Sequence, residues 1–376
     1  MKMLSVHIHA VRLMALASLL CFMGCKPDPL EVPLTYDGTN FEVNTADYSE
    51  AKTNLVALTD LMKQGRTQGK VVSYVKLDSA FSAGSSFPLA SITTTYYKDR
   101  IAGNEGWLSQ LAAASGGTFD PALAPAGTGG VYGGYLFDKN GLELEQVIEK
   151  GLYAAALYNL GEAAFYSPGY ADHLLLLYGG HPDFANSDDA TKHDHADVLV
   201  AKYAARRDKN DGNGYYTQIG YQFRKLQAAL AASDDYQTEL FDADAEIKRL
   251  WEEALAATII NYCYDAAAKL SSTNPSAADK AAALHSISEC VGFVHGWYRA
   301  NIGANYHKLT DADAIALLDL LHAPAEGTPA VYLFATDPFN EVPRLTQVID
   351  KLTELYAFSA TDLEDFKKNW VKEQGR

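Results

Sequence analysis

The spacing of apolar residues along this chain is mostly that of α-helices. Leu55, Leu58, Leu61 and Met62 form one apolar stripe, and stripes with the same spacing recur after Gly141. Apolar residues at intervals of three and four mark a helix that buries one face. The pattern predicts helices at about 142–166, 194–207, 214–232, 242–270, 276–299, 311–322, 341–357 and 361–374.

Helices of this number and length predict an all-α fold made of two packed helical bundles. Alanine is frequent throughout, which favours helix and allows close packing. Ser276, next to Pro275, is a candidate cap for the helix at 276–299. The short segments EKGL (149–152) and EEAL (252–255) each open an alanine-rich helix, which leaves an internal duplication as one possible origin.

Two stretches depart from the helical pattern. Residues 71–77 (VVSYVKL) have the composition of a strand. Residues 115–135 are rich in Gly, Ala, Pro and Thr, and we expect them to form a long loop.

The first 24 residues have the pattern of a secretory signal. A basic region with Lys2 and Arg12 precedes a short apolar run that ends at Met23, and Gly24 stands before Cys25. The run is too short to span a bilayer. A small residue before cysteine is typical of bacterial lipoproteins, in which cleavage exposes the cysteine for lipidation. We predict a lipoprotein signal peptide at 1–24 and lipidation of Cys25.

The segment after Cys25 has the composition of a linker. Residues 26–35 (KPDPLEVPLT) hold three prolines and no apolar period. We predict a tether at 25–35 and a single domain at 36–376, with lobes at about 36–235 and 236–376.

Charge restricts the partners. The chain has 31 basic and 47 acidic residues, a formal charge of −16. Removal of the signal, which carries Lys2 and Arg12 and no acid, makes this −18. Such a chain is repelled by nucleic acid and by anionic lipid, so we expect no nucleic-acid partner. Attachment to the outer membrane would be through lipid on Cys25, on the periplasmic side or at the cell surface.

Two cysteines remain after Cys21 and Cys25. Cys263 and Cys290 fall on neighbouring predicted helices, roughly 12 Å out of register when counted from the turn between them. A disulfide needs Cα atoms closer than about 7 Å. We therefore expect two buried free thiols.

Three segments together resemble an imelysin-like lipoprotein family of unknown function. They are VPLTYDGTNFEVN (32–44), GLELEQVIEKGL (141–152) and HSISECVGF (285–293), in this order. The resemblance implies an all-α fold of two helical bundles. Imelysin relatives are grouped with metallopeptidases through a G-x-H-x-x-E motif, and the wider group is linked to iron or haem acquisition near outer-membrane transporters.

Carried over to this chain, the motif is preserved only in part. His173 matches the motif histidine, but Leu176 stands where the acid is expected and Asp172 where the family tends to have another histidine. The second, similar element keeps His285 and Glu289.

His285 and Glu289 are one helical turn apart, so both side chains lie on one face. Imidazole and carboxylate at this spacing can share a divalent metal such as iron or zinc. A structural His–Glu hydrogen bond between helices is the alternative. Asp172, His173 and Glu149 are the natural outside partners to complete a metal site, although Glu149 also fits an exposed carboxylate at a helix start. Ser288, Gly292 and Gly296 fall on the same face, which predicts close approach of another helix.

Residues 181–197 (HPDFANSDDATKHDHAD) have a metal-like composition, with His181, His193 and His195 among five aspartates. The spacing is loose, and we interpret the segment as a solvated acidic loop. No P-loop, Rossmann fingerprint, H-E-x-x-H or G-x-S-x-G motif occurs, which leaves kinase, dehydrogenase and serine-hydrolase functions without support.

We therefore expect an outer-membrane lipoprotein that binds a metal or haem as an accessory of iron uptake, with binding rather than catalysis as its role. One alternative is a metal-dependent hydrolase of the imelysin type. Another is a glycan- or peptide-binding accessory of an outer-membrane transporter, for which Tyr96–Tyr97 and Tyr215–Tyr216 could supply aromatic surfaces.

Overall fold

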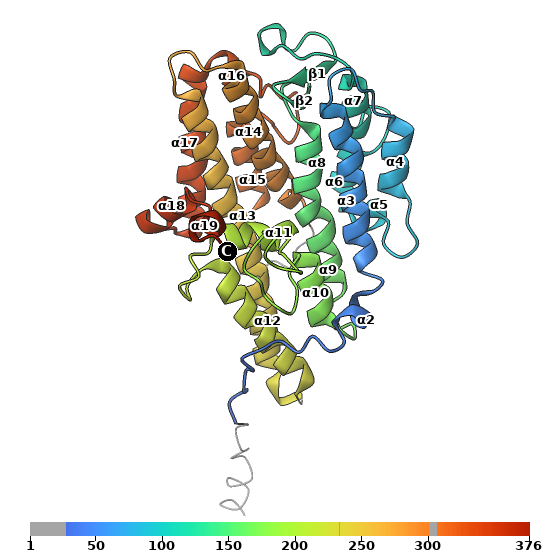
Figure 1. Ribbon diagram of the computed structural model, residues 1–376, viewed down its shortest axis with the longest axis vertical. Helices are drawn as coiled ribbons and strands as arrows, with labels where there is room; N and C mark the ends of the chain where they lie inside the picture. The colour runs from blue at the N-terminus through green and yellow to red at the C-terminus, as the bar shows by residue number, and fades with distance from the viewer. Residues whose placement is uncertain (1–27, 233, 301–306) are drawn as a thin grey trace, which may run out of the picture.

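A computed structural model describes residues 28–232, 234–300 and 307–376 as an assembly of packed helices with one small hairpin (Figure 1). The fold class is all-α, as predicted. The predicted signal peptide and Cys25 lie outside the described residues. Among the described residues, no helix combines the length and apolar character needed to cross a membrane.

The helices, in chain order, are α2 (Phe41–Thr45), α3 (Ser49–Lys63), α4 (Tyr74–Ser82), α5 (Leu89–Ile92), α6 (Thr95–Ile101), α7 (Trp107–Ala114), α8 (Leu144–Leu152), α9 (Asn159–Ala163), α10 (Tyr170–Tyr178), α11 (Leu199–Arg207), α12 (Tyr215–Ala231), α13 (Gln237–Leu270), α14 (Ala277–Trp297), α15 (Asp311–Leu320), α16 (Leu333–Thr336), α17 (Pro338–Tyr356), α18 (Ala360–Phe366) and α19 (Trp370–Gln374). Short 3-10 turns are η1 (Gln64–Arg66), η2 (Pro121–Leu123) and η4 (Asp234–Tyr236), and a π-helical segment, η3 (Tyr153–Tyr158), joins α8 to α9.

The strand predicted at 71–77 is wrong, because the chain enters α4 at Tyr74. Two of its three valines are not buried: Val71 and Val75 are 69% and 73% exposed, while Val72, before the helix, is 7% exposed. Leu77 and Phe81 are fully buried instead, and their spacing of four places them on one face of a helix. Burial at helical spacing therefore outweighs the β propensity of the valines.

The predicted loop at 115–135 includes the first strand and the turn of an antiparallel hairpin, which was not predicted. β1 (Gly129–Tyr132) pairs with β2 (Tyr135–Asp138), with Gly129 opposite Asp138. Gly133 and Gly134 connect the strands and both have positive φ, 55° and 89°. Such a two-residue turn favours glycine and is a recognisable hairpin signal.

α14 lies between α8 and α13, and these three helices form the centre of the molecule (Figure 1). The predicted close approach of another helix is confirmed at Gly292 and Gly296. A Cβ at Gly292 would lie 2.8 Å from Gln146 O, and one at Gly296 would lie 2.4 Å from Gly151 O. Only glycine permits this contact between α14 and the α8–η3 segment.

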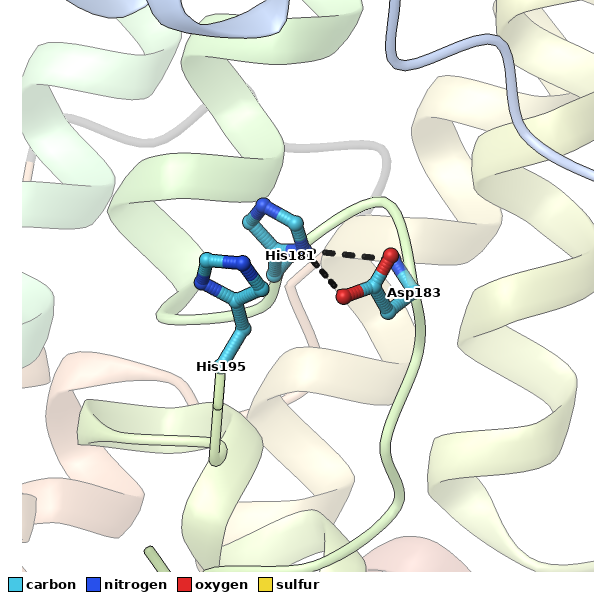
Figure 2. Close-up of side chains that lie close together, drawn as sticks. All are labelled: His181, Asp183 and His195. Carbon is cyan, nitrogen blue, oxygen red and sulfur yellow. Dashed lines mark hydrogen bonds and ion pairs between the residues drawn. The ribbon is translucent and has the colours of Figure 1, made fainter. Parts of the chain in front are cut away.

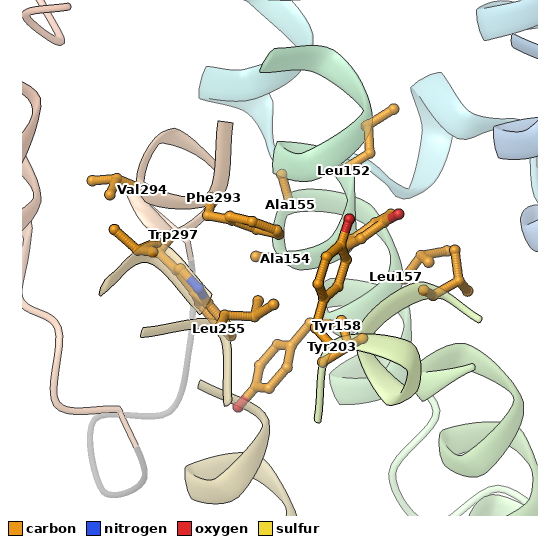
Figure 3. Packing of buried hydrophobic residues seen from close by; sticks show 14 of the residues in the cluster. Leu152, Ala154, Ala155, Leu157, Tyr158, Tyr203, Leu255, Phe293, Val294 and Trp297 are labelled. Carbon is orange, nitrogen blue, oxygen red and sulfur yellow. The ribbon is translucent and has the colours of Figure 1, made fainter. Parts of the chain in front are cut away.

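The π-helical segment η3 packs into the core beside α14 and α13. Leu157 and Tyr158 lie among buried residues that include Leu255 and Trp297 (Figure 3). Donors from outside the helix bond its carbonyls: Thr94 N–H donates to Ala155 O at 2.8 Å. A widened turn of this kind changes the direction in which the preceding residues of α8 point.

Several boundaries differ from the prediction. α11 starts at Leu199, five residues later than expected, and the predicted helix at 361–374 is two helices, α18 and α19, with the second capped by Asn369. The cap at Ser276 is confirmed, since Ser276 and Asp279 form a reciprocal capping box at the start of α14.

Cys263 and Cys290 are buried free thiols, as predicted. The predicted offset of about 12 Å is wrong, because Cys263 lies close enough to Cys290 to raise the pKa of its thiol.

α12 and α13 pack against each other across the predicted boundary between lobes at residues 235 and 236. The two-lobe division and the proposed duplication stay predictions. Residues 28–35, at the predicted tether, contain neither helix nor strand, and Leu34 is 95% exposed.

Candidate functional site

A polar cavity of about 910 Å³ lies between the α3–η1 segment, α8, α11, α13 and α14. Its volume is in the range of small-molecule sites. The charged, histidine and tyrosine side chains that line it are Lys63, Arg66, Tyr135, Glu149, Lys150, Lys202, Tyr203, Arg206, Arg207, Tyr262, Tyr264, Asp265, Lys269, His285, Glu289 and Lys367.

The lining is cationic although the chain is acidic. Eight lysines and arginines face three carboxylates there, in a protein whose formal charge is −16. A concave surface lined mainly by one sign of charge concentrates the electrostatic field and attracts ions of the opposite sign. The cavity thus differs in charge from the rest of the molecule.

Arg66 binds two carboxylates at the start of α8. Its Nη2 lies 2.7 Å from Glu143 Oε1 and also pairs with Glu145. Both glutamate side chains are almost completely buried. Burial and the neighbouring charge of Glu143 raise the pKa of Glu145 to about 8. The charge of Arg66 is therefore already paired with these two carboxylates.

His285 lies between two carboxylates. Its Nδ1 is 2.5 Å from Glu143 Oε2, and its Nε2 is 3.6 Å from Glu289 Oε2. The ring stacks on Tyr135, with centroids 4.5 Å apart. Burial alone would lower the pKa of His285, but the hydrogen bond and charge of Glu143, with the charge of Glu289, raise it above the ordinary value. These surroundings favour the imidazolium form.

Lys150 joins Glu149 to Glu289. Its Nζ lies 2.9 Å from Glu149 Oε2 and 3.5 Å from Glu289 Oε1, and the lysine side chain is 5% exposed. Tyr153 and Tyr262 donate to the two carboxylates, at 3.0 and 3.3 Å. Burial alone would raise the pKa of Glu149, but the ammonium of Lys150 holds it well below its usual range. The group is an ion-pair network within the cavity wall.

Lys202 and Arg207, both on α11, have no such partner. No ion pair joins either side chain to a carboxylate in the part of the chain that the structure describes. Burial, with repulsion from Arg206 and Lys150, lowers the pKa of Lys202 to about 8. Burial also lowers the pKa of Arg207 to about 10; this side chain is 7% exposed, donates to Phe366 O, and leaves its Nε unpaired.

Three of the five metal ligands predicted from the sequence reach this cavity: His285, Glu289 and Glu149. The ammonium group of Lys150 lies between the carboxylates of Glu149 and Glu289 and pairs with both. Metal binding by this set stays a prediction. The alternative, a structural hydrogen bond between helices, describes His285 and Glu143 rather than His285 and Glu289.

Asp172 and His173 lie elsewhere, on α10. Asp172 accepts from Tyr36 at 2.6 Å and from Asn44 at 2.7 Å. His173 Nε2 is 2.9 Å from Asn44 O, and its ring stacks on Tyr48 at 3.9 Å. Both side chains are buried and tie α10 to the segment around α2. They share no contact with His285 or Glu289.

Sequence reasoning missed the cations that characterise the cavity. Lys63, Lys150, Lys202 and Lys367 are far apart in the chain, and a lysine in a helix or at its end is ordinarily solvated. A local signal is Arg207, which falls on the face of Val200, Tyr203 and Ala204 in α11 and is buried with them.

Comparison of the chain with models of protein families, with curated protein sequences and with solved structures found no match. The resemblance to imelysin-like lipoproteins therefore stays a prediction.

Proposed function

We propose that this chain is a binding protein whose cationic cavity holds a small molecule with several negative charges. The observation that carries the proposal is the pair Lys202, which is partly buried, and Arg207, which is buried: both line the cavity and lack a carboxylate partner. A buried charge is costly unless it is paired. An anion in the cavity would supply the missing charge.

The cavity is less favourable for a metal ion bound by the predicted ligands His285, Glu289 and Glu149. His285 already contacts Glu143, and Glu289 and Glu149 already contact Lys150, so a metal would have to displace a proton and compete with an ammonium. A haem macrocycle needs extensive apolar walls. The charged side chains of this cavity suit carboxylate or phosphate groups instead.

An anionic ligand remains compatible with a role in iron acquisition. Fe³⁺ is a hard cation that oxygen donors bind, and its chelates with small polycarboxylates carry net negative charge. We therefore infer that a carboxylate chelate of Fe³⁺ is one member of the ligand class. The protein would hold the chelate without chemical turnover and pass it to an outer-membrane transporter.

The place of action that we propose is the outer membrane, through lipid on Cys25. The described chain starts at Asp28, whose carbonyl accepts from Tyr236 at 3.0 Å, near the start of α13. This supports an attachment point at the end of the molecule where the long α13 begins (Figure 1).

The test is calorimetric titration of the chain from residue 26 onward with citrate, Fe³⁺-citrate and inorganic phosphate. We expect at least one of these anions to bind, more weakly as ionic strength rises. Lys202→Gln should weaken binding about tenfold or more, as loss of one charge-assisted hydrogen bond implies.

The matched control is Lys98→Gln, an exposed lysine on α6 that lies outside the cavity. It should bind as the unmodified chain does. Absence of binding for all three anions, or equal weakening in the control, would contradict the proposal. Binding of Fe²⁺ or Zn²⁺ that disappears in His285→Ala would favour the metal site instead.

A further inference from the structure

The loop between α10 and α11 brings three potential metal ligands together outside the cavity. His181, Asp183 and His195 each place a nitrogen or carboxylate oxygen within 4.8 Å of the other two. Figure 2 shows the two imidazole rings side by side, with Asp183 beside His181. Within the described residues, this is the one such group of three histidine, cysteine or acidic side chains.

We propose that His181, Asp183 and His195 bind one divalent transition metal ion, with Zn²⁺, Cu²⁺ or Ni²⁺ as the class. Two imidazoles and one carboxylate are a ligand set that these ions accept, and water or a further donor would complete the coordination. The site is independent of the anion-binding cavity, because none of its three residues lines that cavity.

The loop is held in place without any metal. Asp197 N–H donates to Ser187 O, and Ser187 N–H donates to Asp197 Oδ2, both at 2.8 Å. Tyr216 on α12 donates to Asp197 Oδ1 at 2.6 Å. At the ends of the loop, Val198 N–H donates to Gly179 O at 3.0 Å. These bonds hold the backbone of the loop, so the segments that carry His181 and His195 stay close together.

His181 is the best-placed ligand. Its Nδ1 lies 3.1 Å from Asp183 Oδ2, and its ring packs edge-to-face on Phe41 with centroids 5.3 Å apart.

The ring of His195 must turn before it can share a metal ion with His181. Its ring is stacked on that of His181, with centroids 3.7 Å apart and planes 15° from parallel, so the two sets of nitrogens do not yet converge. Donors on one tetrahedral Zn²⁺ lie roughly 3.3 Å apart, so the atoms must close by at most roughly 1.5 Å. The side chain of His195 is exposed to solvent.

The test is competition of the full chain, purified without a polyhistidine tag, against a chromophoric chelator for Zn²⁺, then for Ni²⁺ and Cu²⁺. We expect one metal ion per chain. His181→Gln and His195→Gln should each weaken binding about tenfold or more, since removal of even an outer partner of a metal ligand does so.

His193→Gln is the matched control, because His193 belongs to the same loop but not to the group of three. It should bind the metal as the unmodified chain does, and His285→Gln should too. Failure of all three metals to bind, equal weakening in His193→Gln, or loss only in His285→Gln would overturn the proposal. Thermal unfolding of each variant checks that the exposed loop substitutions leave the fold intact.

Anion binding is measured on the same variants. His181→Gln should bind citrate, Fe³⁺-citrate or phosphate as the unmodified chain does. Failure of the metal site and failure of the anion-binding cavity are therefore distinguishable.

Discussion

Glu143 and His285 are 142 residues apart in the sequence, yet their side chains meet with Oε2 and Nδ1 separated by 2.5 Å. Glu143 precedes the first turn of α8, and His285 lies in the middle of α14. The contact is possible because Gly292 and Gly296 bring the backbones of these helices together. A packing feature of α14 thus brings a buried carboxylate against a cavity histidine.

Glu143→Gln should lower the pKa of His285. The carboxylate is the main group that opposes the effect of burial on this imidazole, and glutamine removes its charge. Two-dimensional NMR of histidine ring protons, followed against pH, measures the change. His181, which lies outside the cavity and packs on Phe41, is the internal reference, and its titration should not change. An unchanged titration of His285 would show that Glu143 does not govern it.

The same pair gives a pH dependence of stability. The folded pKa of His285 is raised, so its contribution to the free energy of unfolding is fully present below the unfolded value of about 6.5. It is lost as the pH rises through the folded pKa. Urea unfolding from pH 5.5 to 8.5 should therefore show a larger decline for the unmodified chain than for His285→Gln, and parallel curves would contradict this.

Lys202→Gln should make the protein more stable while it weakens anion binding. The folded pKa of Lys202, about 8, lies below its ordinary value of 10.5, so the charged form opposes folding. We expect a gain of about 1–3 kcal/mol in the free energy of unfolding near pH 7. The gain should shrink as the pH rises from 8 towards 10.5, where the lysine of the unmodified chain is neutral in both states.

Urea unfolding at pH 7 and pH 9.5 measures the effect, with Lys98→Gln as the control expected to change little. A loss of stability in Lys202→Gln at pH 7 would mean that the ammonium already has a stabilising partner. Gain of stability with loss of binding is the pattern of a residue kept for function.

Native thiols should be unreactive. Cys263 and Cys290 are fully buried, and burial, with the adjoining thiol, raises the pKa of Cys290 well above its ordinary value. In the chain from residue 26 onward, a thiol reagent at pH 8 should modify neither cysteine until denaturant is added, and both afterwards. Rapid native reaction would show that the α13–α14 contact opens readily. No reaction in denaturant would reveal a disulfide.

Much of the helical fold could be predicted because the spacing of apolar residues within one helix shows which of its faces is buried. Ile247, Leu250, Trp251 and Leu255 repeat with helical spacing along α13, and all four are buried. The valines near residue 73 were misleading because strand propensity is a weak signal against burial at helical spacing. The early helices α4 to α7 are short, so their apolar periods are hard to separate from chance.

The site was predictable only where its residues are neighbours in the chain. His285 and Glu289 share a helix face, and this was visible as a spacing of four. Lys63, Lys150 and Lys202 reach the same cavity from helices whose relative placement depends on tertiary packing, which no local pattern encodes. The proximity of His181 and His195 could not be predicted for the same reason, since it depends on the hydrogen bonds around Asp197.

Gly296→Ala should destabilise the protein strongly, because the new methyl group would meet backbone. A Cβ there would lie 2.4 Å from Gly151 O and 2.8 Å from Gly151 Cα, and neither atom can turn away as a side chain could. Overpacking of this kind costs about 1–3 kcal/mol or more. Thermal and urea unfolding measure the loss.

Gly220→Ala, on α12, is the matched control for the gain in helix propensity. Its Cβ would meet only side-chain atoms there, with Phe184 Cδ1 nearest at 3.2 Å. This substitution should be neutral or stabilise by up to about 1 kcal/mol. Because α14 holds His285 against Glu143, Gly296→Ala should also lower the pKa of His285 in the folded protein. A stable variant with an unchanged titration would show that α8 and α14 can separate without consequence for the cavity.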